Sequence, residues 1–152
     1  LPWVRKVSVR RQFPWGVAVR FEEHVPLAVW NDTAWVNTHG EIFQTGSLEP
    51  DSTLPHFYGL PDSASDVAGM YAAFTRDLLP LGQQIAQISV SPRRAWQLRL
   101  SNGVVLKLGA DQLRQRMARY VASYSHALLP MEDLLSYVDL RYRNGFAVRT
   151  RG

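Results

Sequence analysis

Short glycine-containing turns between strand-like segments constrain the fold of this chain more than any other feature. Asn102 and Gly103 separate residues 95–100 from residues 104–108, and both segments carry apolar residues at alternate positions. An Asn-Gly pair tolerates the positive φ angles that a tight hairpin turn needs. Connections this short join antiparallel neighbours, because a parallel pair needs a crossover of a dozen or more residues.

Further alternating segments indicate a sheet of several strands. Residues 4–13 and 17–23 are expected to pair as a hairpin around a turn at residues 14–16. Additional strands are expected at residues 26–30, 34–37, 41–43 and 85–90. A turn ending in glycine, residues 38–40, joins two of them. Residues 44–62 are rich in Pro, Gly, Ser and Asp, and we expect a long loop there.

Two segments have the periodicity of amphipathic helices. The first begins at Ser63 or Ser65, either of which can cap it, and ends at Pro80. Its apolar stripe consists of Val67, Met70, Tyr71, Phe74 and Leu78. The second spans about residues 110–126, and its inner face carries Leu113, Met117, Tyr120, Val121 and Tyr124. Its outer face is expected to carry Arg114, Arg116 and Arg119. The order of elements predicts an α+β fold, a mostly antiparallel β-sheet with two packed helices.

The composition is that of a globular domain with a basic surface. The 152 residues are 46% hydrophobic and 20% charged, which suits one domain or one domain plus a fragment. The net charge is +4, but the arginines are scattered rather than clustered, which favours a solvated surface over a nucleic-acid groove. The chain has no cysteine, which excludes disulfides and cysteine-based zinc sites.

The sequence contains no recognisable targeting segment. No apolar run reaches the roughly 18 residues of a membrane span, and no signal peptide is present. The sequence begins at Leu1 without a methionine. We therefore expect it to be part of a longer protein whose remaining part holds the localisation signal.

Motifs for catalysis and for cofactor binding are missing. The four histidines, at positions 24, 39, 56 and 126, do not have metal-ligand spacing. Neither a GxSxG nucleophile motif nor a phosphate-binding glycine loop occurs. A hydrolase of cell-wall glycan would need a convergent carboxylate pair, and no such pair is evident. We therefore expect a protein without enzymatic activity and without a cofactor.

The C-terminal segment, residues 137–149, reads as another hairpin, with Asn144 and Gly145 at its turn. Because it lies so close to the end of the sequence, we expect no further chain to cover its outer edge. An uncovered edge strand is either an aggregation hazard or a docking site, and we favour the docking site. Tyr142 lies beside the turn between two arginines and is expected to be an exposed interface residue. The large aromatics on strands are instead expected in the core: Trp30, Trp35 and Trp96.

Five stretches in register resemble one known family. They are residues 1–14, 25–32, 54–61, 93–98, and 138–142 together with 144–145. Together these stretches are similar to the periplasmic part of the bacterial cell-division proteins of the FtsQ/DivIB family. The resemblance covers essentially the whole chain and keeps its order.

The resemblance implies a domain organisation that the periodicity does not show. Members of this family have a short cytoplasmic tail, one transmembrane helix, a POTRA domain and a β domain. Residues 1–31 would be the C-terminal part of the POTRA domain, its last two strands, and residues 32–152 the FtsQ-type β domain. The protein would then be a single-pass protein of the bacterial inner membrane at the division septum. This region would lie in the periplasm, and only the absent N-terminal helix would contact the membrane.

The resemblance also implies a function and a binding site. Family members are non-enzymatic divisome scaffolds that bind the FtsB–FtsL pair and help to recruit and regulate septal peptidoglycan synthesis. FtsB adds a β-strand to the C-terminal hairpin, and other divisome proteins are further expected partners. The positions that match the family's partner-binding residues are Arg93, Arg141, Tyr142, Asn144, Gly145, Phe146 and Thr150.

Roles within this set follow from the same resemblance. Tyr142 matches the central aromatic anchor, and Arg93 matches a basic residue that meets an acidic side chain of FtsB. Thr150 stands where some relatives have a tryptophan, and Phe146 is bulkier than the small residue of some members. The alternative function is a basic nucleic-acid-binding β-domain, which would bind with steep salt dependence.

Overall fold

The structure, a computed structural model, describes residues 4–11, 17–44 and 53–151, with side chains in residues 24–44 and 53–151. A small antiparallel sheet pairs β1 (Val4–Arg11) with β2 (Val17–Glu23). The larger sheet contains β3 (Pro26–Trp30), β4 (Ala34–Asn37), β5 (Ile42–Phe43), β6 (His56–Tyr58), β7 (Ile85–Val90), β8 (Trp96–Leu100), β9 (Val105–Gly109), β10 (Leu135–Asp139) and β11 (Ala147–Thr150). Its order is β11-β10-β9-β8-β7-β6-β3-β4-β5.

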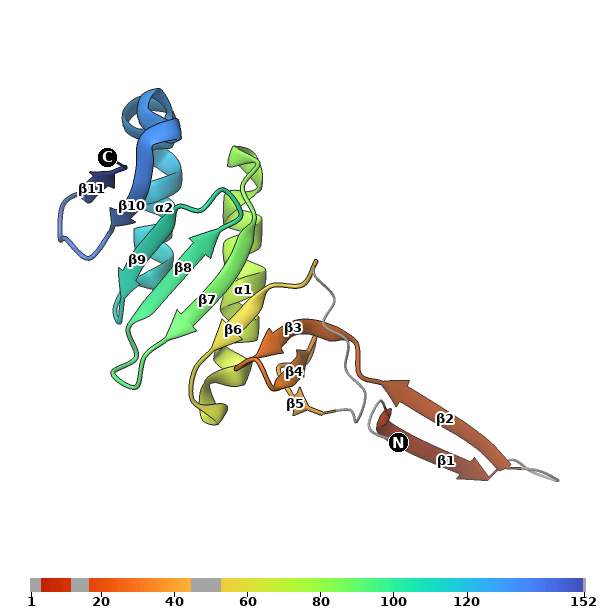
Figure 1. Cartoon of the computed structure of the whole chain (residues 1–152). Helices are drawn as coiled ribbons and strands as arrows, with labels where there is room; N and C mark the ends of the chain where they lie inside the picture. Colours follow the sequence, from red (N-terminus) through yellow and green to blue (C-terminus); the bar gives the residue numbers. More distant parts are fainter. Residues whose placement is uncertain (1–3, 12–16, 45–52, 152) are drawn as a thin grey trace.

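Two helices cover one face of the nine-stranded sheet (Figure 1). They are α1 (Ala64–Leu78), which lies behind β7, and α2 (Leu113–Ser123), which lies behind β9. A π-helical turn, η3 (Tyr124–Leu128), extends α2. Short 3-10 turns are η1 (Pro61–Ser63), η2 (Leu79–Leu81) and η4 (Leu129–Leu134). The predicted α+β class is confirmed.

The expectation that the connections are too short for parallel pairing is wrong. β6 and β7 are parallel neighbours joined through α1, and β9 and β10 are parallel neighbours joined through α2. β3 and β6 are also parallel, whereas the other five neighbouring pairs of this sheet are antiparallel. The helices are therefore crossovers between adjacent strands. Both crossovers run in the same direction across the sheet, and right-handed crossovers of that kind place both helices on the same face.

A strand lies within the segment that was expected to be a loop. β6 occupies the middle of the sheet, between β3 and β7. Phe57 of this strand is fully buried and packs against Tyr71 of α1, with 5.2 Å between the ring centroids. A three-residue strand with prolines close on both sides is too short to show alternation in the sequence. β6 is a strand because it pairs with β3 on one side and β7 on the other.

The glycine turns close their hairpins as predicted, each through a three-residue loop. Gly103 has φ of 91°, and its amide donates to the carbonyl of Leu100 at 2.9 Å. Gly40 has φ of 79°, and its amide donates to the carbonyl of Asn37 at 3.0 Å. Both loops place glycine in the left-handed position that follows a type I turn. The turn expected at residues 14–16 lies outside the described residues.

The C-terminal hairpin is present, but the expectation of a tight Asn144-Gly145 turn is wrong. β10 ends at Asp139 and β11 begins at Ala147, so the seven residues 140–146 form a loop between them. The reason lies in the two ends of the loop. Leu140 is fully buried in the core, and Phe146 packs against the core. Strand pairing stops where these side chains turn inward.

The helix stripes fill the core largely as predicted. Met117 and Phe74 are fully buried, and Trp30, Trp35 and Trp96 are buried on their strands. Ser63 precedes α1, but it makes no capping bond, because its hydroxyl donates to the carbonyl of Leu60 at 2.6 Å. The outer face predicted for α2 is correct only for Arg114, which is exposed. Arg116 and Arg119 are half-buried and reach back to backbone carbonyls.

The domain boundary between residues 31 and 32 stays a prediction. β1 and β2 form a sheet of their own that lies apart from the larger sheet in Figure 1. β3, which the predicted boundary assigns to the first domain, pairs with β4 and β6 in the nine-stranded sheet.

Candidate partner-binding site

β11 is the outermost strand at one end of the nine-stranded sheet. It pairs with β10 from Leu135↔Thr150 to Asp139↔Ala147. Among the described strands, none pairs with its other edge. Three of its four residues are exposed, including Val148 with 37% of its surface accessible. The strand therefore offers unpaired backbone donors and acceptors to an incoming strand.

The loop of residues 140–146, here called the β10–β11 loop, presents Tyr142 beside this edge. Tyr142 is 54% exposed, as predicted for an interface residue. The loop is fixed from α2: the Arg119 guanidinium donates to the carbonyls of Tyr142 at 2.8 Å, Arg143 at 3.0 Å and Gly145 at 3.1 Å. An exposed aromatic ring on a restrained loop has the properties of an interface anchor.

A buried carboxylate secures the base of the loop. Asp139 at the end of β10 accepts two bonds from the Arg141 guanidinium, from Nε at 2.8 Å and from Nη2 at 2.6 Å. It also accepts the backbone amide of Arg141 at 3.1 Å. These bonds from Arg141, chiefly those of its side chain, hold the pKa of Asp139 below its ordinary value although burial opposes the shift. Arg141 is thus oriented by Asp139 with about half of its side chain exposed.

Gly109, at the end of β9, makes room for this arrangement. Its φ is 72°, and a Cβ there would lie 2.7 Å from Nη1 of Arg116 and 3.1 Å from Cγ of Arg141. Arg116 itself donates to the carbonyl of Leu108. The positive φ favours glycine here, and a Cβ would also force the side chains of Arg116 and Arg141 to shift.

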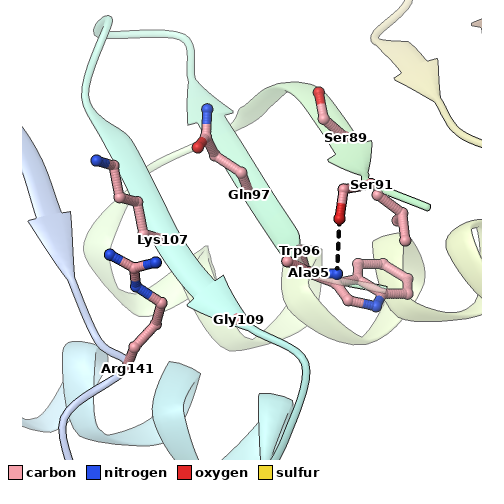
Figure 2. Close-up of a pocket in the computed structure, with 9 residues that line it drawn as sticks. Ser89, Ser91, Ala95, Trp96, Gln97, Lys107, Gly109 and Arg141 are labelled. Carbon is pink, nitrogen blue, oxygen red and sulfur yellow. Dashed lines mark hydrogen bonds between the residues drawn. The ribbon is translucent and has the colours of Figure 1, made fainter. Parts of the chain in front are cut away.

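A shallow pocket of about 260 Å³ continues from Arg141 across the uncovered face of the sheet (Figure 2). Ser89, Gln97 and Lys107 stand side by side on β7, β8 and β9, and Arg141 reaches in from the end of β10. The Lys107 ammonium lies 4.0 Å from the ring centroid of Tyr137 on β10. The pocket is cationic and rich in hydrogen-bond donors, so it suits an acidic side chain of a partner.

Arg93 lies in the turn between β7 and β8, but it is not one of the residues that line this pocket. Ser91 and Ala95 of that turn line the pocket, and the Ala95 amide donates to the Ser91 hydroxyl at 3.1 Å (Figure 2). Arg93 is exposed. Its neighbour Arg94 has a positive φ of 64° and pairs with Asp62 at 3.3 Å.

The structure brings most of the predicted site residues to one corner of the molecule. Arg141, Tyr142, Asn144 and Gly145 share the β10–β11 loop, and the turn that contains Arg93 lines the pocket through Ser91 and Ala95. Phe146 belongs to the same loop but packs against the core. Thr150 lies at the opposite end of β11, opposite Leu135, so the structure separates it from the loop.

Sequence reasoning missed Arg119 and the Lys107–Tyr137 pair. Arg119 lies three residues from Arg116, beside the apolar stripe of α2, and this border position is the only sequence signal for its role. Lys107 and Tyr137 come from strands that are neighbours only because of the parallel β9–β10 pairing. No sequence pattern brings those two residues together.

The described residues contain neither a metal-ligand cluster nor a membrane-spanning helix. They contain no group of three His, Asp or Glu side chains arranged to hold a metal ion. Likewise, none of their helices is both long and apolar enough to span a membrane.

Comparison with known proteins assigns the fold to a family. Residues 28–141 match the family model described as cell division protein FtsQ/DivIB, C-terminal. The chain is similar to cell division protein FtsQ of Nitrosospira multiformis, with 48% identity over 98% of this chain and 62% of the relative. It is 38% identical to FtsQ of Burkholderia pseudomallei over 100% of this chain and 62% of that protein.

A third relative extends the agreement. FtsQ of Shewanella oneidensis is 40% identical over 97% of this chain and 56% of its own length. The chain thus spans less than two thirds of the length of these relatives. The family model covers most of the nine-stranded sheet and both helices, from β3 to the start of the β10–β11 loop. The chain therefore belongs to the FtsQ/DivIB family of non-enzymatic bacterial cell-division proteins.

Proposed function

We propose that the outer edge of β11 and the β10–β11 loop bind an FtsB-like partner by β-strand addition. Through this contact the protein would hold the FtsB–FtsL pair at the septum and help to regulate septal peptidoglycan synthesis. It would act in the periplasm as a scaffold, held by a transmembrane helix outside this sequence. The family assignment supports these functions, and one structural observation supports the docking mode.

That observation is the combination of an open strand edge with an exposed anchor beside it. The main chain of β11 supplies hydrogen bonds, which give affinity to any extended segment. The Tyr142 ring and the cationic pocket at Arg141 supply the side-chain contacts that select a partner. A partner segment that pairs with β11 and carries acidic side chains toward the pocket would use both features.

The arginines of the described region do not support the nucleic-acid alternative. Arg114 pairs with Asp77, Arg94 with Asp62 and Arg141 with Asp139. Arg116 and Arg119 donate to backbone carbonyls. These five arginines are engaged within the protein, and the basic side chains of the described region are scattered over several elements. A nucleic-acid groove instead presents its cations along a continuous track.

The direct test is titration of this chain with the periplasmic segment of an FtsB-like protein. Tyr142→Ala should weaken binding at least tenfold, since an anchor of this kind contributes about 2 kcal/mol or more. Leu79→Ala is the control, because Leu79 is the most exposed large apolar side chain among the described residues and lies at the end of α1. It should bind like the wild type, and both variants should melt at the wild-type temperature.

Strand addition has its own signature in backbone hydrogen exchange. Amides of β11 that point away from β10 should exchange fast in the unbound chain and slowly in the complex. Tight binding that leaves those amides unprotected would refute strand addition. Affinity that is the same in Tyr142→Ala and the wild type would place the site elsewhere on the protein.

A further inference from the structure

We infer that Arg119 is a positioning residue for partner binding: it holds the β10–β11 loop in the conformation that presents Tyr142. This inference rests on the proposed docking function and identifies the residue on which the shape of the docking site depends. Arg119 lies on α2, outside the loop and outside the edge strand.

The geometry is that of one cation enclosed by a bend of the main chain. Nη1 of Arg119 donates to the carbonyls of Tyr142 and Gly145, and Nη2 donates to the carbonyl of Arg143. The loop therefore curves around the guanidinium and turns three carbonyls toward it. A planar fork with several donors can satisfy such an array, whereas the single ammonium of lysine cannot match it.

The loop has few other restraints between its two ends. Leu140 is buried in the core, and Phe146 packs against it, but residues 141–144 are exposed and belong to neither strand. At the base, Asp139 orients Arg141. Beyond Arg141, the bonds from Arg119 are what ties the exposed part of the loop to the body of the domain.

Loss of these bonds should change the loop rather than the fold. The carbonyls involved lie near the surface, so water can replace the guanidinium at little cost to global stability. The loop would then sample other conformations, and only a fraction of molecules would present Tyr142 correctly. The apparent dissociation constant rises by the inverse of that fraction.

The test compares Arg119→Gln with Arg114→Gln. Both changes remove one positive charge from α2, but Arg114 pairs with Asp77 of α1 at 3.2 Å, whereas Arg119 bonds to the loop. Any general loss of attraction for an acidic partner therefore appears equally in both variants. Arg119→Gln should weaken binding of the FtsB-like segment about tenfold, Arg119→Lys should recover part of this loss, and Arg114→Gln should bind like the wild type.

Hydrogen exchange measured without the partner tests the role of Arg119 in the loop independently of the docking proposal. In the unbound chain, the amides of residues 142–145 should exchange faster in Arg119→Gln than in the wild type or Arg114→Gln, while the sheet amides and the melting temperature stay the same. Unchanged loop exchange in Arg119→Gln would overturn the inference even if binding were lost, because Arg119 would then contact the partner directly. A second outcome is that the loop exchanges faster in Arg119→Gln but the wild type does not bind the segment. The docking proposal would then be wrong, and so would the role of Arg119 in binding. Arg119 would only restrain the loop.

A double variant decides whether Arg119 acts through Tyr142. If it does, Arg119→Gln should cost nothing further in the Tyr142→Ala background, so the double variant should bind like Tyr142→Ala alone. Losses that multiply in the double variant would show two independent contributions and overturn the positioning role.

Discussion

The two outer strands of the nine-stranded sheet, β5 and β11, are built in opposite ways. β5 has two residues, and its Phe43 is only 6% exposed and packs with Val29 and Trp35 in a small second core. β11 has four residues, three of them exposed. Proteins protect edge strands by making them short or by covering them. β5 follows this rule, and β11 departs from it, which is expected of an edge that receives a partner.

The loops beside these two edge strands are also held in different ways. The turn before β5 is held locally by the buried Asn37, whose Oδ1 accepts the amides of His39 at 2.9 Å and Glu41 at 2.8 Å. The β10–β11 loop is held by Arg119 from another element. A turn fixed by its own sequence is part of the fold, whereas a loop fixed by a distant side chain can be released without unfolding. This difference supports the proposal that β11, rather than β5, receives a partner.

The largest expected effect tests the β5 edge. Phe43→Ala should destabilise the fold by about 3 kcal/mol, because it removes a buried aromatic side chain and leaves a cavity beside Trp35. Urea denaturation measures the loss. Ile42→Ala is the control on the same strand, since Ile42 is 38% exposed, and it should cost less than about 1 kcal/mol.

Phe43→Ala also tests whether the β5 edge contributes to stability without contributing to binding. Under conditions where Phe43→Ala is still folded, its affinity for the FtsB-like segment should equal that of the wild type. A loss of affinity in the folded variant would show that the two edges are coupled, and the comparison between them would fail.

A smaller effect is expected at the base of the binding edge. Asp139→Asn should cost about 2 kcal/mol at pH 7, because it removes the charge from the buried bonds to Arg141. Since those bonds lower the pKa of Asp139 in the folded state, their contribution is complete above the ordinary value of 3.8. It is lost as the pH falls through the lowered pKa of the folded state. Urea denaturation between pH 7 and pH 2 should therefore show the wild type and the variant converging in acid.

The exposed ion pair at the β7–β8 turn is the control for that measurement. Asp62 and Arg94 lie 3.3 Å apart with more than half of each side chain exposed. Asp62→Asn should change stability by less than about 1 kcal/mol at any pH. A constant difference between Asp139→Asn and the wild type across the pH range would mean that the charge of Asp139 has no part in stability.

The parts of the fold that sequence reasoning found are those fixed by short-range patterns. Gly40 and Gly103 marked their loops because only a residue tolerant of positive φ fits there, and alternation placed Trp30 and Trp96 in the core. β6 was missed because three residues cannot display a period. The parallel pairings were missed because a helix between two strands does not say whether they become neighbours.

The candidate site was predictable to a similar degree. The exposure of Tyr142 followed from its place beside a turn and between charged residues. The shape of its loop did not, since it depends on Arg119, whose bonds cross 23 to 26 residues of sequence. Long arginine side chains bond to whatever carbonyls the tertiary fold brings near, and that neighbourhood is not encoded in the local sequence. Arg119 accordingly looked like a solvated helix residue.

The smallest expected effect concerns the apolar surface of β11 itself. Val148→Ala should weaken binding of the FtsB-like segment by about 1 kcal/mol, roughly fivefold, since it removes a partly exposed side chain that an added strand would cover. Val25→Ala is the control, because Val25 is 57% exposed and lies before β3, at the other end of the sheet. Calorimetric titration of both variants resolves a difference of this size. Equal affinities for the two variants would mean that the partner does not cover β11, so the open edge would be exposed for a reason other than binding.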